Sequence, residues 1–209
     1  MRSATILIAT ANQGKLGEVM AILAGLPVHL TTLEDYPDLP VPVEDAETFE
    51  GNAKRKALHY AALTGCWTLA DDSGLEVDAL GGEPGVHSAR YAGPGCDAAA
   101  NNAKLIRELS DISPGQRMAR FRCVIALAGP EEVLATASGA LHGVIVDQAR
   151  GTGGFGYDPH FLVPEYGMTT AEMLPEQKNR ISHRGRALQA VRPAIERLLA
   201  GSSVAGLND

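Results

Sequence analysis

The sequence predicts an α/β fold with a mixed parallel and antiparallel sheet flanked by helices, and three observations support this. Residues 4–10, ATILIAT, are apolar on both faces of a strand, as in a buried sheet, and a helical stripe follows them. Residues 118–147 form two strand-like runs around a Gly129-Pro130 turn, which predicts an antiparallel hairpin or meander. Further helical patterns lie between and after these strands. No linker of distinct composition divides the chain, so we expect a single domain over residues 1–209.

The N-terminal part alternates between helices and strands. After the turn ANQG, apolar residues recur at helical spacing, which predicts a helix closed by Gly25 and Pro27. This stripe consists of Leu16, Val19, Met20 and Leu23. Three prolines between Tyr36 and Pro42 predict an extended connection. Thr48 is then a candidate N-cap for a helix through FEGNAKRKALHYAAL.

A second strand, CWTLA at 66–70, is expected to end at Ala70, before a glycine-rich loop that reaches about Gly95. Asp97 can cap the next helix. The apolar stripe of that helix includes Leu105, Ile106 and Leu109. A last helix is predicted from Ser182, in which Pro193 should introduce a kink or begin a fresh first turn.

Composition and charge exclude several classes of protein. The formal net charge of −7 argues against binding to a nucleic-acid polymer, although a few local cations would suffice for a small anionic ligand. The three cysteines, Cys66, Cys96 and Cys123, suggest neither a disulfide framework nor a zinc site. No signal-peptide pattern and no apolar run near the length of a membrane span is present. We therefore expect a cytoplasmic protein without a membrane partner.

Two adjacent carboxylates, Asp71 and Asp72, follow the strand 66–70 in the sequence LADDSGLEVDALGGEPG. An Asx-type turn would explain one aspartate and the glycine but not both carboxylates. Like charges at a buried strand end repel each other unless a cation compensates them, and Mg²⁺ typically binds one or two carboxylates plus substrate phosphates. Successive strand residues face opposite ways, so only one of the two should face a given cleft. Glu44, on the proline-rich connection, is the candidate second ligand.

The stretch TANQGK at 10–15 joins a buried strand to a helix and ends in a lysine. Backbone N–H groups at a helix N-terminus attract phosphate, and Asn12 and Lys15 could add a donor and a positive charge. The stretch is not a Walker A loop, because it lacks the leading glycine and the Lys-Ser/Thr pair. A plain strand–helix turn with a surface lysine is the alternative.

The stretch RGTGGFGYDPHF at 150–161 contains a G-x-G-x-x-G pattern, but Pro159 and Pro164 prevent the helix that a dinucleotide-binding fingerprint must open. Phe155 or Tyr157 could instead stack on a flat heterocycle while Asp158 or backbone groups contact its edge. The alternative is a glycine-rich loop whose aromatic residues fill the core.

A cationic cluster lies in EQKNRISHRGRA at 176–187. Lys178, His183 and Arg184 are donors suited to anions or carbonyl oxygens. A solvated helix face is the ordinary explanation of such a cluster, and Ser182 could simply cap the final helix.

Five stretches together resemble the inosine/xanthosine triphosphate pyrophosphatases, the HAM1-like family of non-canonical purine nucleoside-triphosphate pyrophosphatases. In order, they are ATANQGKLGEV, ETFEGNAKRKA, LADDSGLEVDALGGEPGVHSARYAG, GGFGYDPHF and AEMLPEQKNRISHRGRAL. The resemblance implies an elongated mixed sheet with two lobes around a central cleft, in a homodimer. It also implies Mg²⁺-dependent hydrolysis of the small-molecule substrates ITP, dITP and XTP to the monophosphate and pyrophosphate.

Site residues are carried over from the family motif by motif. The resemblance implies that Asp72 is the catalytic carboxylate and a metal ligand, that Glu44 also binds the metal, and that Ser73 touches substrate. It assigns the phosphates to Thr10, Ala11, Asn12, Gln13, Gly14 and Lys15. It assigns the nucleoside and base to Phe155, Gly156, Tyr157, Asp158, Lys178, His183 and Arg184.

Several positions depart from the family pattern. The chain has Gly51 where glutamate is frequent, Gln177 where glutamate is common, Ala11 in place of Gly or Ser, and His87 in place of tyrosine. Gly51 leaves one acid fewer near the metal. Two alternative functions remain: a pyrophosphatase for other nucleotides such as modified pyrimidines, and a nucleotide sensor that binds without turnover.

Overall fold

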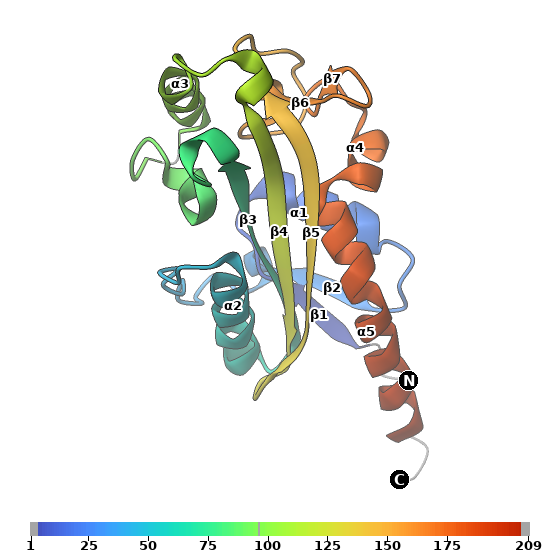
Figure 1. Ribbon diagram of the computed structural model, residues 1–209. Helices are drawn as coiled ribbons and strands as arrows, with labels where there is room; N and C mark the ends of the chain where they lie inside the picture. Colours follow the sequence, from blue (N-terminus) through green and yellow to red (C-terminus); the bar gives the residue numbers. More distant parts are fainter. Residues whose placement is uncertain (1–3, 96, 206–209) are drawn as a thin grey trace. The chain divides into compact units, whose positions relative to one another are not determined.

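A computed structural model describes residues 4–95 and 97–205, with side chains described as far as Ala200. Seven strands form one sheet in the order β2-β1-β3-β4-β5-β6-β7, with helices around it (Figure 1). The predicted α/β class with a mixed sheet is therefore confirmed: β1 pairs in parallel with β2 and β3, whereas β6 pairs in antiparallel fashion with β5 and β7.

The chain forms two compact units, each discontinuous in sequence. Unit 1 contains the described residues up to Asp72, then Val124–Gly139 and the residues from Arg184 onward; unit 2 contains Ser73–Cys123 and Ala140–His183. Three strands run through both units: β3 (Trp67–Val77), β4 (Met118–Ala128) and β5 (Val133–Ile145). The predicted central cleft between two lobes stays a prediction.

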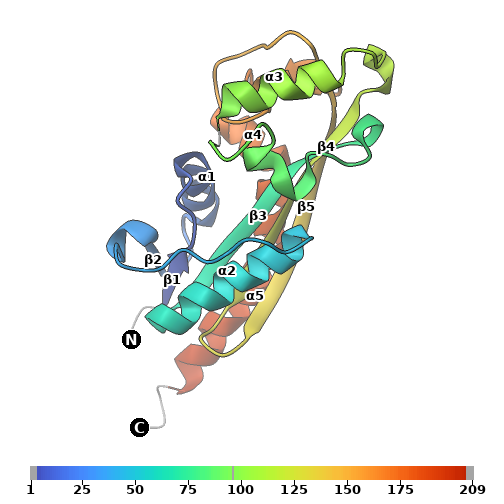
Figure 2. The same cartoon turned by 90° about the vertical axis from the view of Figure 1, so that its left-hand side faces the viewer.

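Unit 1 begins with a β-α-β arrangement. Its own elements are β1 (Thr5–Ile8), α1 (Gln13–Leu23), β2 (His29–Thr32), α2 (Phe49–Thr64) and α5 (His183–Ala205), whose first residue belongs to unit 2. Because β2 and β3 lie on opposite sides of β1, right-handed crossovers place α1 and α2 on opposite faces of the sheet. Figures 1 and 2 show α5 on the face opposite α2. Both faces of β1 are thus covered, and Ile6, Leu7 and Ile8 are fully buried.

The helix caps of unit 1 follow the sequence. Thr48 accepts a hydrogen bond from the Gly51 backbone N–H at 3.0 Å, as predicted for the N-cap of α2. Between β2 and α2 the chain has one short 3-10 turn, Leu33–Asp35, and then the predicted extended connection. Helix α5 runs through Pro193 without interruption, so the alternative of a fresh helix at that proline was wrong.

Unit 2 has its own hydrophobic core. Its elements besides the shared strands are α3 (Ala98–Glu108), β6 (Phe161–Val163), β7 (Met168–Thr169) and α4 (Pro175–Ile181). Asp97 caps α3 by accepting from the Ala99 N–H at 2.8 Å, as predicted. The core gathers Leu75, Leu105, Phe121, Leu141, Tyr157 and Phe161.

The predicted hairpin is confirmed. A turn closed by the Gly129 N–H and the Glu132 carbonyl, 2.9 Å apart, joins the neighbouring strands β4 and β5, and so short a connection requires antiparallel strands. The predicted strand 66–70 was too short, because β3 continues to Val77. Short 3-10 turns, Asp78–Leu80 and Gly85–Arg90, replace part of the predicted loop. The rejection of a dinucleotide fingerprint is also confirmed, because only a three-residue 3-10 turn, Asp158–His160, follows the 151–156 glycines.

Candidate active site

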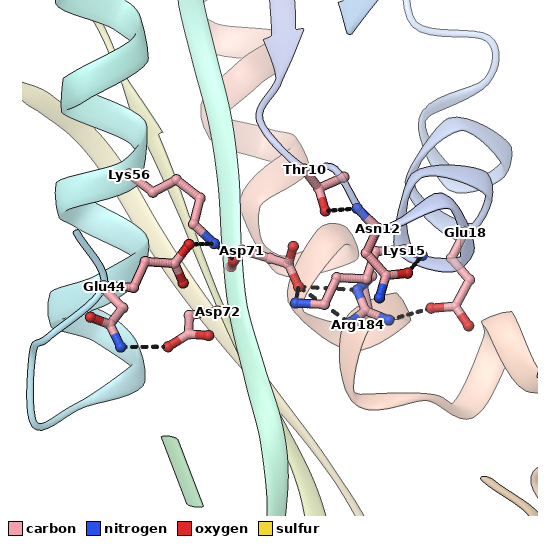
Figure 3. A network of polar contacts seen from close by, with 10 residues as sticks. Thr10, Asn12, Lys15, Glu18, Glu44, Lys56, Asp71, Asp72 and Arg184 are labelled. Atoms are coloured by element: carbon pink, nitrogen blue, oxygen red, sulfur yellow. Dashed lines mark hydrogen bonds and ion pairs between the residues drawn. The ribbon is translucent and has the colours of Figure 1, made fainter. Parts of the chain in front are cut away.

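Asp71 and Asp72 lie within β3 rather than at its end, and their side chains leave the strand on opposite sides (Figure 3). The alternation expected of successive strand residues is therefore confirmed, whereas the predicted strand end at Ala70 was wrong. Both carboxylates are buried, at 3% and 8% exposure. The strand can continue through them because each finds a polar partner contributed by a distant part of unit 1.

Asp71 is the anion of a buried ion cluster. Its Oδ2 lies 3.1 Å from Lys15 Nζ on α1 and 3.2 Å from Arg184 Nη2 on α5 (Figure 3). Arg184 is 1% exposed and also pairs with Glu18. Burial opposes ionisation of Asp71, but Lys15, Arg184 and Lys56 outweigh it and hold its pKa well below the usual range. These contacts do not favour a role of Arg184 at a nucleobase.

Asp72 faces α2, where Asn52 Nδ2 donates to its Oδ2 at 2.9 Å. Burial raises the pKa of Asp72, and this effect exceeds the opposing influence of Asn52, Lys15 and Lys56. Glu44 is close enough to raise that pKa further by repulsion. A buried carboxylate with a raised pKa beside a second carboxylate is typical of catalytic and metal-binding sites.

Lys56 on α2 contacts both Glu44 and the backbone of β3. Its Nζ lies 2.9 Å from Glu44 Oε1 and 3.2 Å from the backbone oxygen of Asp71. Burial disfavours its charge, but Asp71 and Glu44 more than compensate and raise its pKa. Sequence reasoning missed Asn52 and Lys56 as site residues. Their spacing of i, i+4 on the helix that follows Glu44 was the available signal.

The predicted phosphate loop, residues 10–15, forms the connection from β1 into the first turn of α1. Asn12 caps the helix by accepting from the Lys15 N–H at 3.0 Å, and its own N–H donates to Thr10 Oγ1 at 3.2 Å. Ala11, Asn12, Gln13 and Gly14 are exposed. The N-terminal end of α1 is therefore exposed, and Lys15, in the first turn of this helix, pairs with the buried Asp71.

The donor set at Asp72 and Glu44 fits a divalent metal ion that shares its coordination with a substrate. Two carboxylates that repel each other supply hard oxygen ligands of the kind Mg²⁺ prefers. Within residues 4–95 and 97–205, no three His, Cys, Asp or Glu side chains gather into a metal site. Asp72 and Glu44 would supply part of the coordination of such an ion, and phosphate oxygens would supply the rest.

Unit 2 contains a second cluster of predicted site residues. Asp158 is 3% exposed, and its Oδ2 accepts from Lys178 Nζ at 2.6 Å and from the Phe155 N–H at 2.8 Å. Its Oδ1 accepts from Thr170 Oγ1 at 2.7 Å. The Lys178 ammonium lies 4.9 Å from the centroid of the half-buried Phe155 ring. Asp158 therefore fixes Phe155 and Lys178 rather than offering a free carboxylate.

Other residues predicted around the base have different surroundings. Tyr157 is 6% exposed, belongs to the core of unit 2 and donates to the Ser88 carbonyl at 2.8 Å, so its burial does not favour stacking on a ligand. Gly156 accepts from Asn102 Nδ2 at 2.9 Å. The His183 ring stacks on Phe121 at 4.9 Å between centroids. Ser73 follows Asp72 on β3 and is half-buried.

Other observations concern the cysteines and the membrane. Cys66 is half-buried, Cys123 is buried, and Cys96 lies outside the described residues. No helix in the described ranges combines the length and apolarity needed to span a bilayer.

Comparison with known proteins gives consistent matches over nearly the whole chain. Residues 6–194 match the Ham1 family. The chain is 57% identical over 183 residues to the dITP/XTP pyrophosphatase of Geobacter sulfurreducens, covering 88% of this chain and 92% of that protein. It is 49% identical over 193 residues to the dITP/XTP pyrophosphatase of Desulforamulus reducens, covering 92% and 96%. The solved structure of a HAM1 protein from Coxiella burnetii superposes with a TM-score of 0.85 at 38% identity, covering 93% and 99%.

Proposed function

Because the chain belongs to the Ham1 family, we propose that it is a hydrolase that cleaves non-canonical purine nucleoside triphosphates, namely dITP, XTP and ITP, into the monophosphate and pyrophosphate. The observation that carries this proposal is the pair of Asp72 and Glu44 in unit 1: Asp72 is buried with a raised pKa, and Glu44 lies close enough to raise that pKa by repulsion. A divalent metal bound together with a triphosphate would supply the positive charge that offsets the repulsion between these two carboxylates.

In this proposal Asp72 and Glu44 hold Mg²⁺. When bound, the metal would neutralise phosphate oxygens and promote attack by water. Lys56, a half-buried cation 2.9 Å from Glu44, holds that carboxylate in place through an ion pair. Lys15 and the N-terminal end of α1 bind phosphate oxygens, and Lys15 exchanges part of its contact with Asp71 for the substrate.

Asp72 is proposed to orient the attacking water and accept its proton. Burial raises the pKa of this carboxylate, which brings it closer to that of a useful general base. Attack at the α-phosphorus breaks the bond to the β-phosphate and releases pyrophosphate. Phosphoryl transfer depends mainly on positioning and charge stabilisation, so the mechanism requires no cysteine or serine nucleophile.

Phe155 and Lys178 are proposed to recognise the base. Phe155 offers a ring face, and Lys178, held by Asp158, offers a donor to the 6-oxo group of hypoxanthine or xanthine. Adenine has an amino group at that position, so it would place a hydrogen-bond donor opposite the Lys178 ammonium instead of an acceptor. The cytoplasmic location and the homodimer implied by family resemblance are further parts of this proposal.

A panel of nucleotides tests the function. The full-length protein with Mg²⁺ is expected to release pyrophosphate from dITP, XTP and ITP and much less from dATP, dGTP, dTTP or UTP. A preference for a pyrimidine would favour the alternative pyrophosphatase, and binding of dITP without turnover would favour the sensor.

Isotope labelling tests the point of attack. In H₂¹⁸O, attack at the α-phosphorus places the label in the monophosphate. Label in the pyrophosphate would instead indicate attack at the β-phosphorus and would contradict the proposed mechanism.

A further inference from the structure

Helix α2 carries a polar stripe along one face, and this stripe contacts the segment that bears Glu44. The stripe consists of Asn52, Arg55, Lys56 and His59, at positions i, i+3, i+4 and i+7. The segment comprises residues 40–46, the last part of the irregular connection before α2, and is called here the 40–46 segment. All of these residues belong to unit 1.

Each residue of the stripe holds a different point of the 40–46 segment. His59 Nε2 donates to the Pro40 carbonyl at 2.8 Å, and Lys56 pairs with Glu44 at 2.9 Å. Arg55 pairs with Asp45. Asn52 accepts from the Ala46 N–H at 2.9 Å and donates to the Ala46 carbonyl at 3.4 Å. The segment therefore runs antiparallel to the helix, with contacts at both of its ends and on either side of Glu44.

Neither hydrogen-bonded secondary structure nor hydrophobic burial explains why this segment keeps its place. Residues 41–46 belong to no helix or strand. Val41 and Val43, on the two sides of Pro42, are 81% and 73% exposed. The position of Glu44 thus depends on side-chain contacts from α2.

Gly51, near the start of α2, allows the end of the 40–46 segment to lie close to the helix. A β-carbon at this position would lie 2.8 Å from the Ala46 β-carbon and 3.2 Å from Thr48 Oγ1, so any side chain here would displace the end of the segment. The departure from the glutamate that is frequent at this position in the family is therefore consistent with a segment held tightly against α2.

We propose that Arg55 and His59 are positioning residues that set the affinity of the metal site by holding the 40–46 segment, and with it Glu44, against α2. The inference rests on the proposed function, in which Glu44 is a metal ligand. His59 binds the Pro40 carbonyl and Arg55 binds the side chain of Asp45, the neighbour of Glu44, so both act on Glu44 through other residues of the segment. Outer contacts of this kind orient metal ligands and tune metal affinity.

The test uses Arg55→Ala, His59→Ala and the double variant of the full-length protein. Mn²⁺ binding is measured from the electron paramagnetic resonance signal of the free ion, and the Mg²⁺ concentration that gives half-maximal dITP turnover is measured in parallel. Because exposed polar contacts are individually weak, we expect affinity to fall about threefold for each single variant and about tenfold for the double variant. At saturating Mg²⁺, kcat should stay within about twofold of the wild type, since the stripe sets occupancy and not chemistry.

Conservative and control variants separate positioning from a general loss of stability. His59→Gln keeps a donor for the Pro40 carbonyl, so it should retain most of the affinity lost in His59→Ala. Lys54→Ala is the matched control, because Lys54 lies on the same helix but pairs with Glu50 outside the segment. Hydrogen–deuterium exchange over residues 40–46 should increase in the double variant and not in Lys54→Ala.

The outcomes distinguish this inference from the proposed function. If Glu44→Gln weakens Mn²⁺ binding while the double variant binds like the wild type, the positioning role is wrong and the metal site stands. An equal loss of affinity in Lys54→Ala also overturns the inference, because the effect would then not depend on the segment. If Glu44→Gln leaves metal binding unchanged, the proposed metal site fails and the inference fails with it.

Discussion

Replacement of Asp71 by asparagine should destabilise the protein strongly, because Asp71 is the buried anion shared by Lys15 and Arg184. The carboxylate is 3% exposed and Arg184 is 1% exposed, so solvent screens the cluster little. Removing one partner of a buried ion pair costs about 3–5 kcal/mol, and we expect the lower end because Glu18 stays beside Arg184. At about 2–4 °C per kcal/mol, the melting temperature should fall by roughly 6–12 °C.

The dependence on pH follows from the lowered pKa of Asp71. A carboxylate whose pKa is lower in the folded state contributes stability above its unfolded-state pKa and loses it as pH falls through the folded-state value. Because Lys15, Arg184 and Lys56 more than offset its burial, the folded-state pKa of Asp71 lies well below the usual range. The difference between wild type and Asp71→Asn should therefore persist from pH 8 down to about 4.

Thermal unfolding followed by circular dichroism measures both effects. Asp38→Asn is the control, because Asp38 is exposed on the connection before α2. A loss of less than about 2 °C at pH 7 would refute the account of the cluster, since it would correspond to only about 1 kcal/mol or less. A difference that disappears between pH 7 and pH 5 would refute the assigned direction of the pKa shift.

Three further substitutions test other parts of the site. Glu44→Gln should raise the Mg²⁺ concentration for half-maximal dITP hydrolysis about 10- to 100-fold, because a charged ligand is lost. An unchanged concentration in Mg²⁺ titrations would exclude Glu44 as a ligand. Phe155→Ala should raise KM for dITP about tenfold with a smaller change in kcat, because stacking contributes about 1 kcal/mol or more. An unchanged KM in steady-state kinetics would contradict base stacking. Tyr157→Phe removes the donor to the Ser88 carbonyl and should cost about 1–2 kcal/mol in urea unfolding while dITP kinetics stay nearly constant; a large rise in KM would restore Tyr157 as a base contact.

Local signals predicted much of the fold. Thr48 and Asp97 mark helix starts because a side-chain oxygen can accept the first backbone N–H groups, and both form these caps. The apolar run 4–10 predicted a buried strand because its residues suit both faces of a covered sheet. The turn at Gly129-Pro130 likewise fixed the hairpin.

The length of β3 was not predictable from local patterns. Two aspartates normally end a buried strand, and they continue one here because Lys15, Arg184 and Asn52 neutralise or hydrogen-bond them. Arg184 is 113 residues from Asp71 in sequence, so no local window contains that pair. The i, i+4 spacing of Asn52 and Lys56 was visible in the sequence, but their roles were missed because they depend on which face of α2 meets β3.

Asp72, facing α2 beside Glu44, is proposed to carry the hydrolytic chemistry, and this role can be measured directly. Its most direct test is pyrophosphate release from dITP and Mg²⁺ by Asp72→Asn, with circular dichroism to show that the variant is folded. A folded Asp72→Asn protein should lose turnover by about 10³-fold or more, as loss of a general base and metal ligand requires. A folded variant that releases pyrophosphate at a rate close to that of the wild type would contradict it.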